Sequence, residues 1–152
     1  MMDIFRKIAE FREEEKRLSW TGTFREYIEL VRKRPKIAMT AHARVYEMIA
    51  SHGIAEENGV RKFKFFEQEI FGLDRALERL VEEYFHSAAR RLDVRKRILL
   101  LMGPVSGGKS TIVTMLKRGL EQFSRTDEGA LYAIKGCPMH EEPLHLIPWE
   151  LR

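Results

Sequence analysis

The chain has 152 residues, of which 44% are hydrophobic and 33% are charged, and its formal net charge at pH 7 is +4. This hydrophobic content is enough to bury a core and excludes an intrinsically disordered chain. Charges of both signs are interspersed, which is typical of solvated helix faces, so we expect no nucleic-acid partner. The single cysteine, Cys137, excludes an internal disulfide. No stretch has the pattern of a signal peptide or the length of a membrane span, and we therefore expect a cytoplasmic protein.

The first 60 residues are predicted to form an all-helical segment. An apolar stripe at helical spacing indicates the first helix and is formed by Ile4, Ile8, Phe11 and Leu18. The second helix is predicted to begin after Thr23, which stands three residues before Glu26 as in a capping box, and Pro35 ends it. A third helix is predicted from about Thr40 to Gly53, because glycine suits a C-terminal cap.

From residue 61 onward the pattern changes to that of an α/β domain. The predicted elements are a turn at Asn58 and Gly59, a strand in "VRKFKFF" (60–66), a helix over 73–92, a strand in "RILLLM" (97–102), a helix over 112–123 and a strand in "GALYAIKG" (129–136). The nearly continuous apolar run at 97–102 is typical of a parallel strand buried on both faces. Strand, glycine loop, helix and strand in this order predict the start of a parallel sheet, in a domain that covers 61–152.

Between the apolar run and the next helix stands "GPVSGGKS", which has the spacing G-x-x-x-x-G-K-S of a phosphate-binding loop. Its glycines permit close approach of the backbone, so that successive N–H groups and the N-terminus of the following helix can surround phosphate oxygens. The candidate ATP-binding residues are Gly103, Pro104, Val105, Ser106, Gly107, Gly108, Lys109, Ser110 and Thr111. Lys109 is expected to contact the β- and γ-phosphates and to be the catalytic residue, and the Ser110 hydroxyl to ligate Mg²⁺. Thr111 is a candidate for a phosphate further back.

A second acidic magnesium ligand is not visible after the loop. ATP hydrolysis in this class needs such a residue, normally at the end of a later apolar strand. The acidic residues after position 111 are Glu121, Asp127, Glu128, Glu141, Glu142 and Glu150, and none follows a four-residue apolar run. We therefore expect the chain to be the N-terminal part of a longer protein. On its own it is expected to bind ATP with negligible turnover.

Two other stretches contain candidate functional residues. In "CPMHEEPLHLIP", Cys137, His140 and His145 could ligate zinc. A structural zinc site needs paired ligands from two places, however, so a loop that contacts a partner or substrate is the favoured interpretation. The basic run "RRLDVRKR" (90–97) is interpreted as a solvated helix end rather than as a nucleic-acid contact.

The sequence around the loop resembles the N-terminal ATPase domain of the PrkA-type bacterial serine protein kinases. The residues that carry the resemblance are "WTGTFREYIELVRKRPK", "FGLDRALERLVEEYF", "GPVSGGKST" and "KGCPMHEEPLHLIP". They span essentially the whole chain. The flanks are more specific than the loop, which is shared by P-loop proteins in general.

The resemblance implies an AAA-type ATPase core with a parallel sheet flanked by helices, followed in the family by a C-terminal region with kinase activity toward serine. It places the family's nucleotide-binding loop on 103–111, with Lys109 and Ser110 in the roles given above, and it places 71–74 beside the base. It also implies a protein substrate with a serine acceptor. The family's second acidic magnesium motif, sensor residue, arginine finger and C-terminal kinase region are absent from these 152 residues. The H-R-D, D-F-G and V-A-I-K motifs of ordinary protein kinases are absent as well.

Three functional hypotheses follow. In the first, the chain is the ATP-binding portion of a serine protein kinase. In the second, it belongs to a mechanical AAA-type ATPase that remodels or unfolds a protein partner and assembles into a homo-oligomeric ring. In the third, a vestigial nucleotide site belongs to a regulatory, partner-binding module.

Overall fold

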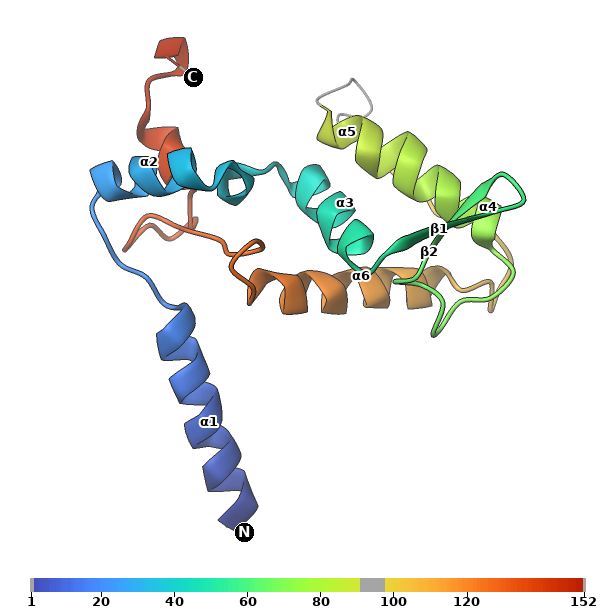
Figure 1. Cartoon of the computed structure of the whole chain (residues 1–152), viewed down its shortest axis with the longest axis horizontal. Helices are drawn as coiled ribbons and strands as arrows, with labels where there is room; N and C mark the ends of the chain where they lie inside the picture. The colour runs from blue at the N-terminus through green and yellow to red at the C-terminus, as the bar shows by residue number, and fades with distance from the viewer. Residues whose placement is uncertain (1, 91–97, 152) are drawn as a thin grey trace. The chain divides into compact units, whose positions relative to one another are not determined.

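The structure, a computed structural model, describes residues 2–90 and 98–151. The chain divides into two compact units (Figure 1). One unit combines Met1–Ala38 with Ser124–Arg152, and the other is Met39–Phe123. The predicted boundary at residue 60 stays a prediction. Among the described residues, no helix is long and apolar enough to cross a membrane.

The first unit contains α1 (Met2–Leu18), α2 (Phe24–Lys33) and three short 3-10 helices, η1 (Pro35–Ala38), η4 (Pro143–Leu146) and η5 (Trp149–Leu151). The first predicted helix is confirmed as α1, although its apolar residues Ile4, Ile8 and Phe11 are all exposed. The predicted capping box at the start of α2 is also confirmed. The Thr23 backbone N–H donates to Glu26 Oε2 at 2.7 Å, and the Thr23 hydroxyl accepts from the Glu26 N–H at 3.3 Å.

The second unit contains α3 (Ala41–Ser51), β1 (Ile54–Glu57), β2 (Val60–Phe63) and α6 (Lys109–Ser124), with one long helix between β2 and the glycine loop. That helix consists of α4 (Asp74–Glu78), the π-helix η2 (Arg79–His86) and α5 (Ser87–Ala89). It matches the described part of the helix predicted over 73–92. Residues 91–97, which hold most of the basic run, lie outside the described residues.

Within the described residues, the sheet consists of two strands, β1 and β2, which form an antiparallel hairpin. Ile54 pairs with Phe63 and Glu57 with Val60. Asn58 and Gly59 form the predicted turn, and both have positive φ angles, of 52° and 73°. Two successive left-handed residues match the right-handed twist of a hairpin, which is why Asn-Gly predicts this turn.

The predicted parallel sheet is not observed in the described part of the chain. Residues 98–102 and 129–136 belong to no strand, so the strands predicted in "RILLLM" and "GALYAIKG" are wrong for the residues that the structure describes. Ile98 and Met102 are 94% and 82% exposed. A strand is held by hydrogen bonds to a neighbouring strand, and an apolar run by itself supplies no such neighbour.

The core of the second unit joins α3, the hairpin, the long helix and α6. Its buried residues are Met48, Ile49, Phe63, Phe65, Phe66, Ile70, Leu77, Leu80, Val81, Phe85, Ile112, Met115 and Phe123. The face of α6 that follows the glycine loop is therefore anchored by Ile112 and Met115. This anchoring fixes the N-terminus of α6, on which the candidate site depends.

Candidate nucleotide-binding site

The glycine loop leads directly into α6, which begins at Lys109. The Gly107 N–H donates to the Pro104 carbonyl at 3.2 Å, and the Ile112 N–H donates to the Gly108 carbonyl at 2.9 Å. The first bond closes a tight turn, and the second begins the backbone ladder of the helix. The sequence prediction of a loop followed by an amphipathic helix is therefore confirmed.

Two residues of the loop have left-handed backbone conformations. Ser106 has a φ angle of 64° and Gly108 one of 75°. A left-handed conformation is unusual for serine and easy for glycine. At Gly107 the constraint is space, because a Cβ atom there would lie 3.0 Å from the Pro104 carbonyl oxygen. Glycine is thus favoured at position 108 by the backbone conformation and at position 107 by the lack of space for a side chain.

The Lys109 side chain folds back onto the loop. Its Nζ donates to the carbonyl oxygen of Gly103 at 2.9 Å and to that of Pro104 at 2.5 Å. The ammonium group is therefore held at the first two residues of the loop. Phosphate oxygens would be stronger, charge-assisted acceptors than these neutral carbonyls.

The N-terminus of α6 adds a second source of positive potential. The helix has 16 residues, and its first turn contains no acidic side chain. The unpaired N–H groups of a helix N-terminus favour anions, and no carboxylate in this turn competes for them. The loop, Lys109 and the helix end together form a site suited to a chain of phosphates.

The predicted magnesium ligand, Ser110, lies exposed in the first turn of α6, next to the half-buried Thr111. The described residues contain no group of three His, Cys, Asp or Glu side chains that could hold a metal ion. Mg²⁺ commonly keeps several waters and takes one or two protein oxygens together with substrate phosphates, which fits a hydroxyl beside a phosphate loop. The zinc alternative at Cys137, His140 and His145 finds no support in this arrangement.

Comparison with known proteins identifies the family. The sequence model described as "PrkA AAA domain" matches residues 22–152. The chain belongs to the PrkA AAA domain family. The family predicted from the residues alone is thereby confirmed, and the family implies the P-loop NTPase fold of an ATP-binding domain.

Three relatives match the chain over different shares of their own length. It is 66% identical over 151 residues to "ATP-dependent protease PrkA" of Bacillus subtilis (strain 168), covering 99% of this chain and 24% of that protein. An "Uncharacterized protein in gldA 5'region" of Geobacillus stearothermophilus is 65% identical over 97 residues, which is 64% of this chain and 100% of that protein. "Serine/threonine kinase YeaG" of Escherichia coli (strain K12) is 41% identical over 58 residues, covering 38% of this chain and 9% of that protein. No solved structure matches the chain.

Leu73, within the segment 71–74, lies next to the glycine loop. The Leu73 Cδ1 atom is 3.6 Å from the position that a Cβ atom on Gly108 would take. Leu73 also lines a pocket of about 500 Å³ between the hairpin β1–β2 and the start of α4. Figure 1 shows the hairpin and α4 next to each other. The structure therefore places Leu73 between a pocket on one side and the loop on the other.

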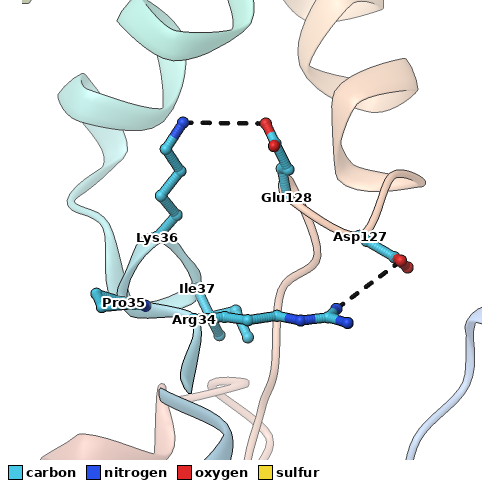
Figure 2. A pocket seen from close by; sticks show the side chains of 6 residues that line it. All are labelled: Arg34, Pro35, Lys36, Ile37, Asp127 and Glu128. Atoms are coloured by element: carbon cyan, nitrogen blue, oxygen red, sulfur yellow. Dashed lines mark ion pairs between the residues drawn. The ribbon is translucent and has the colours of Figure 1, made fainter. Parts of the chain in front are cut away.

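A separate pocket of about 350 Å³ lies within the first unit (Figure 2). Two ion pairs cross it, Arg34 with Asp127 at 3.8 Å and Lys36 with Glu128 at 4.0 Å. All four charged side chains are more than half exposed. Exposed pairs at such distances contribute little to stability, and this pocket has no residue of the glycine loop.

Sequence reasoning did not find the pocket beside Leu73 or the hairpin residues that line it. Glu57 and Lys62 lie on the two hairpin strands, and Asp74 begins α4. Nothing in the local sequence pattern indicates that these three charged residues meet. The Asn-Gly turn was the one available signal, because it predicts that the residues on either side of it face each other.

Proposed function

We propose that the chain binds MgATP through residues 103–111 and that, in the longer protein, the γ-phosphate is transferred to a serine of a protein substrate. The observation that carries this proposal is the loop geometry, with the Lys109 ammonium group at the loop and the α6 N-terminus behind it. The name of the Escherichia coli relative, a serine/threonine kinase, supports the choice of acceptor.

The loop backbone and the first three residues of α6 have separate tasks in this proposal. Backbone N–H groups of the loop and of the first turn of α6 hold the phosphate oxygens, and Lys109 exchanges its two carbonyl partners for oxygens of the β- and γ-phosphates. Ser110 supplies the hydroxyl oxygen for Mg²⁺, and Thr111 contacts a phosphate further back. Residues 71–74 lie beside the base.

Phosphotransfer would form a bond between the serine oxygen and the γ-phosphorus, break the bond to ADP and release the serine proton. The protein's contribution in this class of reaction is positioning and charge stabilisation rather than covalent chemistry. Lys109 and the α6 N-terminus are the described groups that would neutralise charge on the phosphates.

The test uses the longer protein that contains this chain, incubated with ATP labelled on the γ-phosphate. The proposal expects label on protein serine, and it expects the label to be lost in Lys109→Ala. A wild-type protein that binds ATP but leaves every protein serine unlabelled would contradict the kinase assignment. ATP binding by the loop would survive that result.

A second function is favoured by the identity to the Bacillus subtilis relative, which is named an ATP-dependent protease. Here ATP hydrolysis would drive the unfolding or remodelling of a protein partner by a ring of subunits. This alternative expects ATP-dependent assembly, which light scattering of the longer protein would detect. A protein that stays monomeric with saturating ATP would argue against it.

A further inference from the structure

The pocket beside Leu73 has the size and lining of a site for a small molecule. Its volume of about 500 Å³ lies within the range that is typical of ligand pockets, about 300–1,000 Å³. Apolar side chains, Val60, Leu73 and Ala76, line part of it. Such pockets commonly combine apolar walls with a few polar groups that orient the ligand.

The polar groups of this pocket come from both the hairpin and α4. Lys62 Nζ lies 2.7 Å from Glu57 Oε2 on the neighbouring strand and 3.5 Å from Asp74 Oδ2 at the start of α4. The hydrogen bond to Glu57, with the charges of Asp74 and Glu57, raises the pKa of Lys62. The contact with Lys62 lowers the pKa of Glu57. Lys62 and Glu57 are therefore both charged at neutral pH, and the two ion pairs of Lys62 join the hairpin side of the pocket to the start of α4.

The hairpin is also held in place by contacts outside the pocket. The Arg61 backbone N–H donates to Glu78 Oε1 at 2.9 Å, and its guanidinium donates to Glu82 Oε1 at 2.9 Å. Phe63 at the end of β2 is 3% exposed and belongs to the core. A wall fixed by these contacts can orient a ligand without first having to be ordered.

Leu73 connects this wall to the phosphate loop. It lines the pocket and also lies within van der Waals distance of a Cβ position on Gly108. The Leu73 side chain therefore borders on both the pocket and the loop. A nucleoside triphosphate has a nucleoside, whose base has apolar faces and polar edges, and a chain of phosphates. The nucleoside suits the pocket, and the phosphates suit the neighbouring loop.

We propose that the hairpin β1–β2 forms one wall of the nucleotide site and holds the nucleoside half of ATP, with Lys62 as a positioning residue. This inference rests on the proposed ATP binding by the loop. The base packs against Val60, Leu73 and Ala76. Asn58, Glu57 and Asp74 offer hydrogen-bonding groups to the base edge and the ribose hydroxyls, and Lys62 keeps the two carboxylates in place.

The experiment compares two ligands on the 152-residue chain by titration calorimetry in the presence of Mg²⁺. One ligand is ATP, and the other is inorganic tripolyphosphate, which has the phosphates but no nucleoside. Lys62→Met is expected to weaken ATP binding about three- to tenfold, the range that corresponds to one or two lost hydrogen bonds. It should leave the affinity for tripolyphosphate unchanged.

Two further variants keep the test decisive. Ala76→Phe adds a large side chain at an exposed position of α4 that lines the pocket and takes no part in the Lys62 ion pairs, and it should also weaken ATP binding alone. Lys64→Met is the matched control, because Lys64 is an exposed lysine two residues away that does not line the pocket. It should change neither affinity. Thermal unfolding checks that all three variants fold.

The outcomes separate this inference from the proposed function. If Lys62→Met and Ala76→Phe bind ATP with the affinity of the wild type, the hairpin does not form a wall of the nucleotide site and the inference is wrong. The proposed ATP binding by the loop is not contradicted by this result. If both variants lose affinity for ATP and tripolyphosphate equally, the effect is general and the inference is again wrong. If the folded wild type binds neither ligand, the proposed function fails and the inference fails with it.

Discussion

At the scale of single residues, backbone conformation in the glycine loop limits what can replace Gly108. Its φ angle is 75°, a region that alanine enters only at a cost of about 1–2 kcal/mol. We predict that Gly108→Ala rearranges the loop and weakens ATP binding about five- to thirtyfold, as measured by titration calorimetry.

Gly136→Ala is the matched control for this prediction. Gly136 also has a positive φ angle, of 81°, and a Cβ atom there would meet nothing within 4 Å, but the residue lies outside the loop. Its replacement should leave ATP affinity unchanged. Equal ATP affinities of Gly108→Ala and the wild type would show that the left-handed conformation is not needed for binding.

A second residue-scale prediction concerns Glu82, whose side chain is 18% exposed. It lies 2.9 Å from Arg61 Nη1 and 2.8 Å from His86 Nδ1, and His86 stacks on Tyr46. Burial raises the pKa of Glu82, but the hydrogen bonds from His86 and Arg61 outweigh burial, so its pKa is lowered overall. A carboxyl group with a lowered folded-state pKa stabilises the fold above its unfolded pKa of about 4.3 and loses that contribution as the pH falls further.

We therefore predict that Glu82→Gln lowers the free energy of unfolding by about 1–2 kcal/mol at pH 7. The difference from the wild type should shrink between pH 5 and pH 3, because the wild-type carboxylate becomes protonated there. Urea unfolding of both proteins across this range measures the effect. A difference that stays constant down to pH 3 would mean that the ionised carboxylate is not what stabilises this contact.

At the scale of elements, α6 packs closely against its neighbours at Gly119. A Cβ atom at this position would lie 2.7 Å from Met48 Sδ and 2.7 Å from Phe65 Cε2. Alanine improves helix propensity by about 1 kcal/mol, but overpacking costs about 1–3 kcal/mol. Because both contacts would be shorter than 3.0 Å, we expect an overpacking cost of about 2–3 kcal/mol, and we predict that Gly119→Ala lowers the free energy of unfolding by about 1–2 kcal/mol.

Thr114→Ala provides the comparison, because Thr114 is exposed on the same helix and its replacement should change stability by less than about 0.5 kcal/mol. Chemical unfolding measures both variants. A Gly119→Ala variant that is as stable as the wild type, or more stable, would contradict the close packing of α6 on Met48 and Phe65.

The elements differ in how far the sequence predicts them, and the difference has a physical cause. The capping box at Thr23, the turn at Asn58 and Gly59, and α6 depend on residues close in sequence, and their patterns predict them. The strands expected at 97–102 and 129–136 depend on hydrogen bonds to distant segments. Neither hydrophobicity nor alternation says which segment would supply those bonds.

The same distinction holds for the site. Residues 103–111 form a local motif, so the sequence alone predicts them as the candidate site. The contact of Lys62 with Asp74 joins two elements, and 27 basic and 23 acidic residues offer many other pairings. The family resemblance predicts 71–74 beside the base, but nothing in the sequence predicts that the hairpin lines a pocket with Leu73 and Asp74.

At the scale of the whole molecule, two sets of observations bear on function. The glycine loop and its neighbouring pocket lie in the unit Met39–Phe123, so the groups proposed to bind ATP come from one compact unit. The chain spans about a quarter of the length of its Bacillus subtilis relative, 24%. The kinase and remodelling activities are therefore proposals for the longer protein, whereas ATP binding can be measured on these 152 residues.

Titration of the purified chain with MgATP measures ATP binding itself. We predict a Kd between about 1 μM and 1 mM, a range common for enzyme–substrate affinities. We also predict that Lys109→Ala weakens binding at least about tenfold, because a charge-assisted contact to the phosphates is lost. Lys117→Ala, an exposed lysine on the same helix, should leave the affinity unchanged. A folded wild type that does not bind MgATP, or a Lys109→Ala variant that binds it equally well, would show that residues 103–111 are not an ATP-binding site.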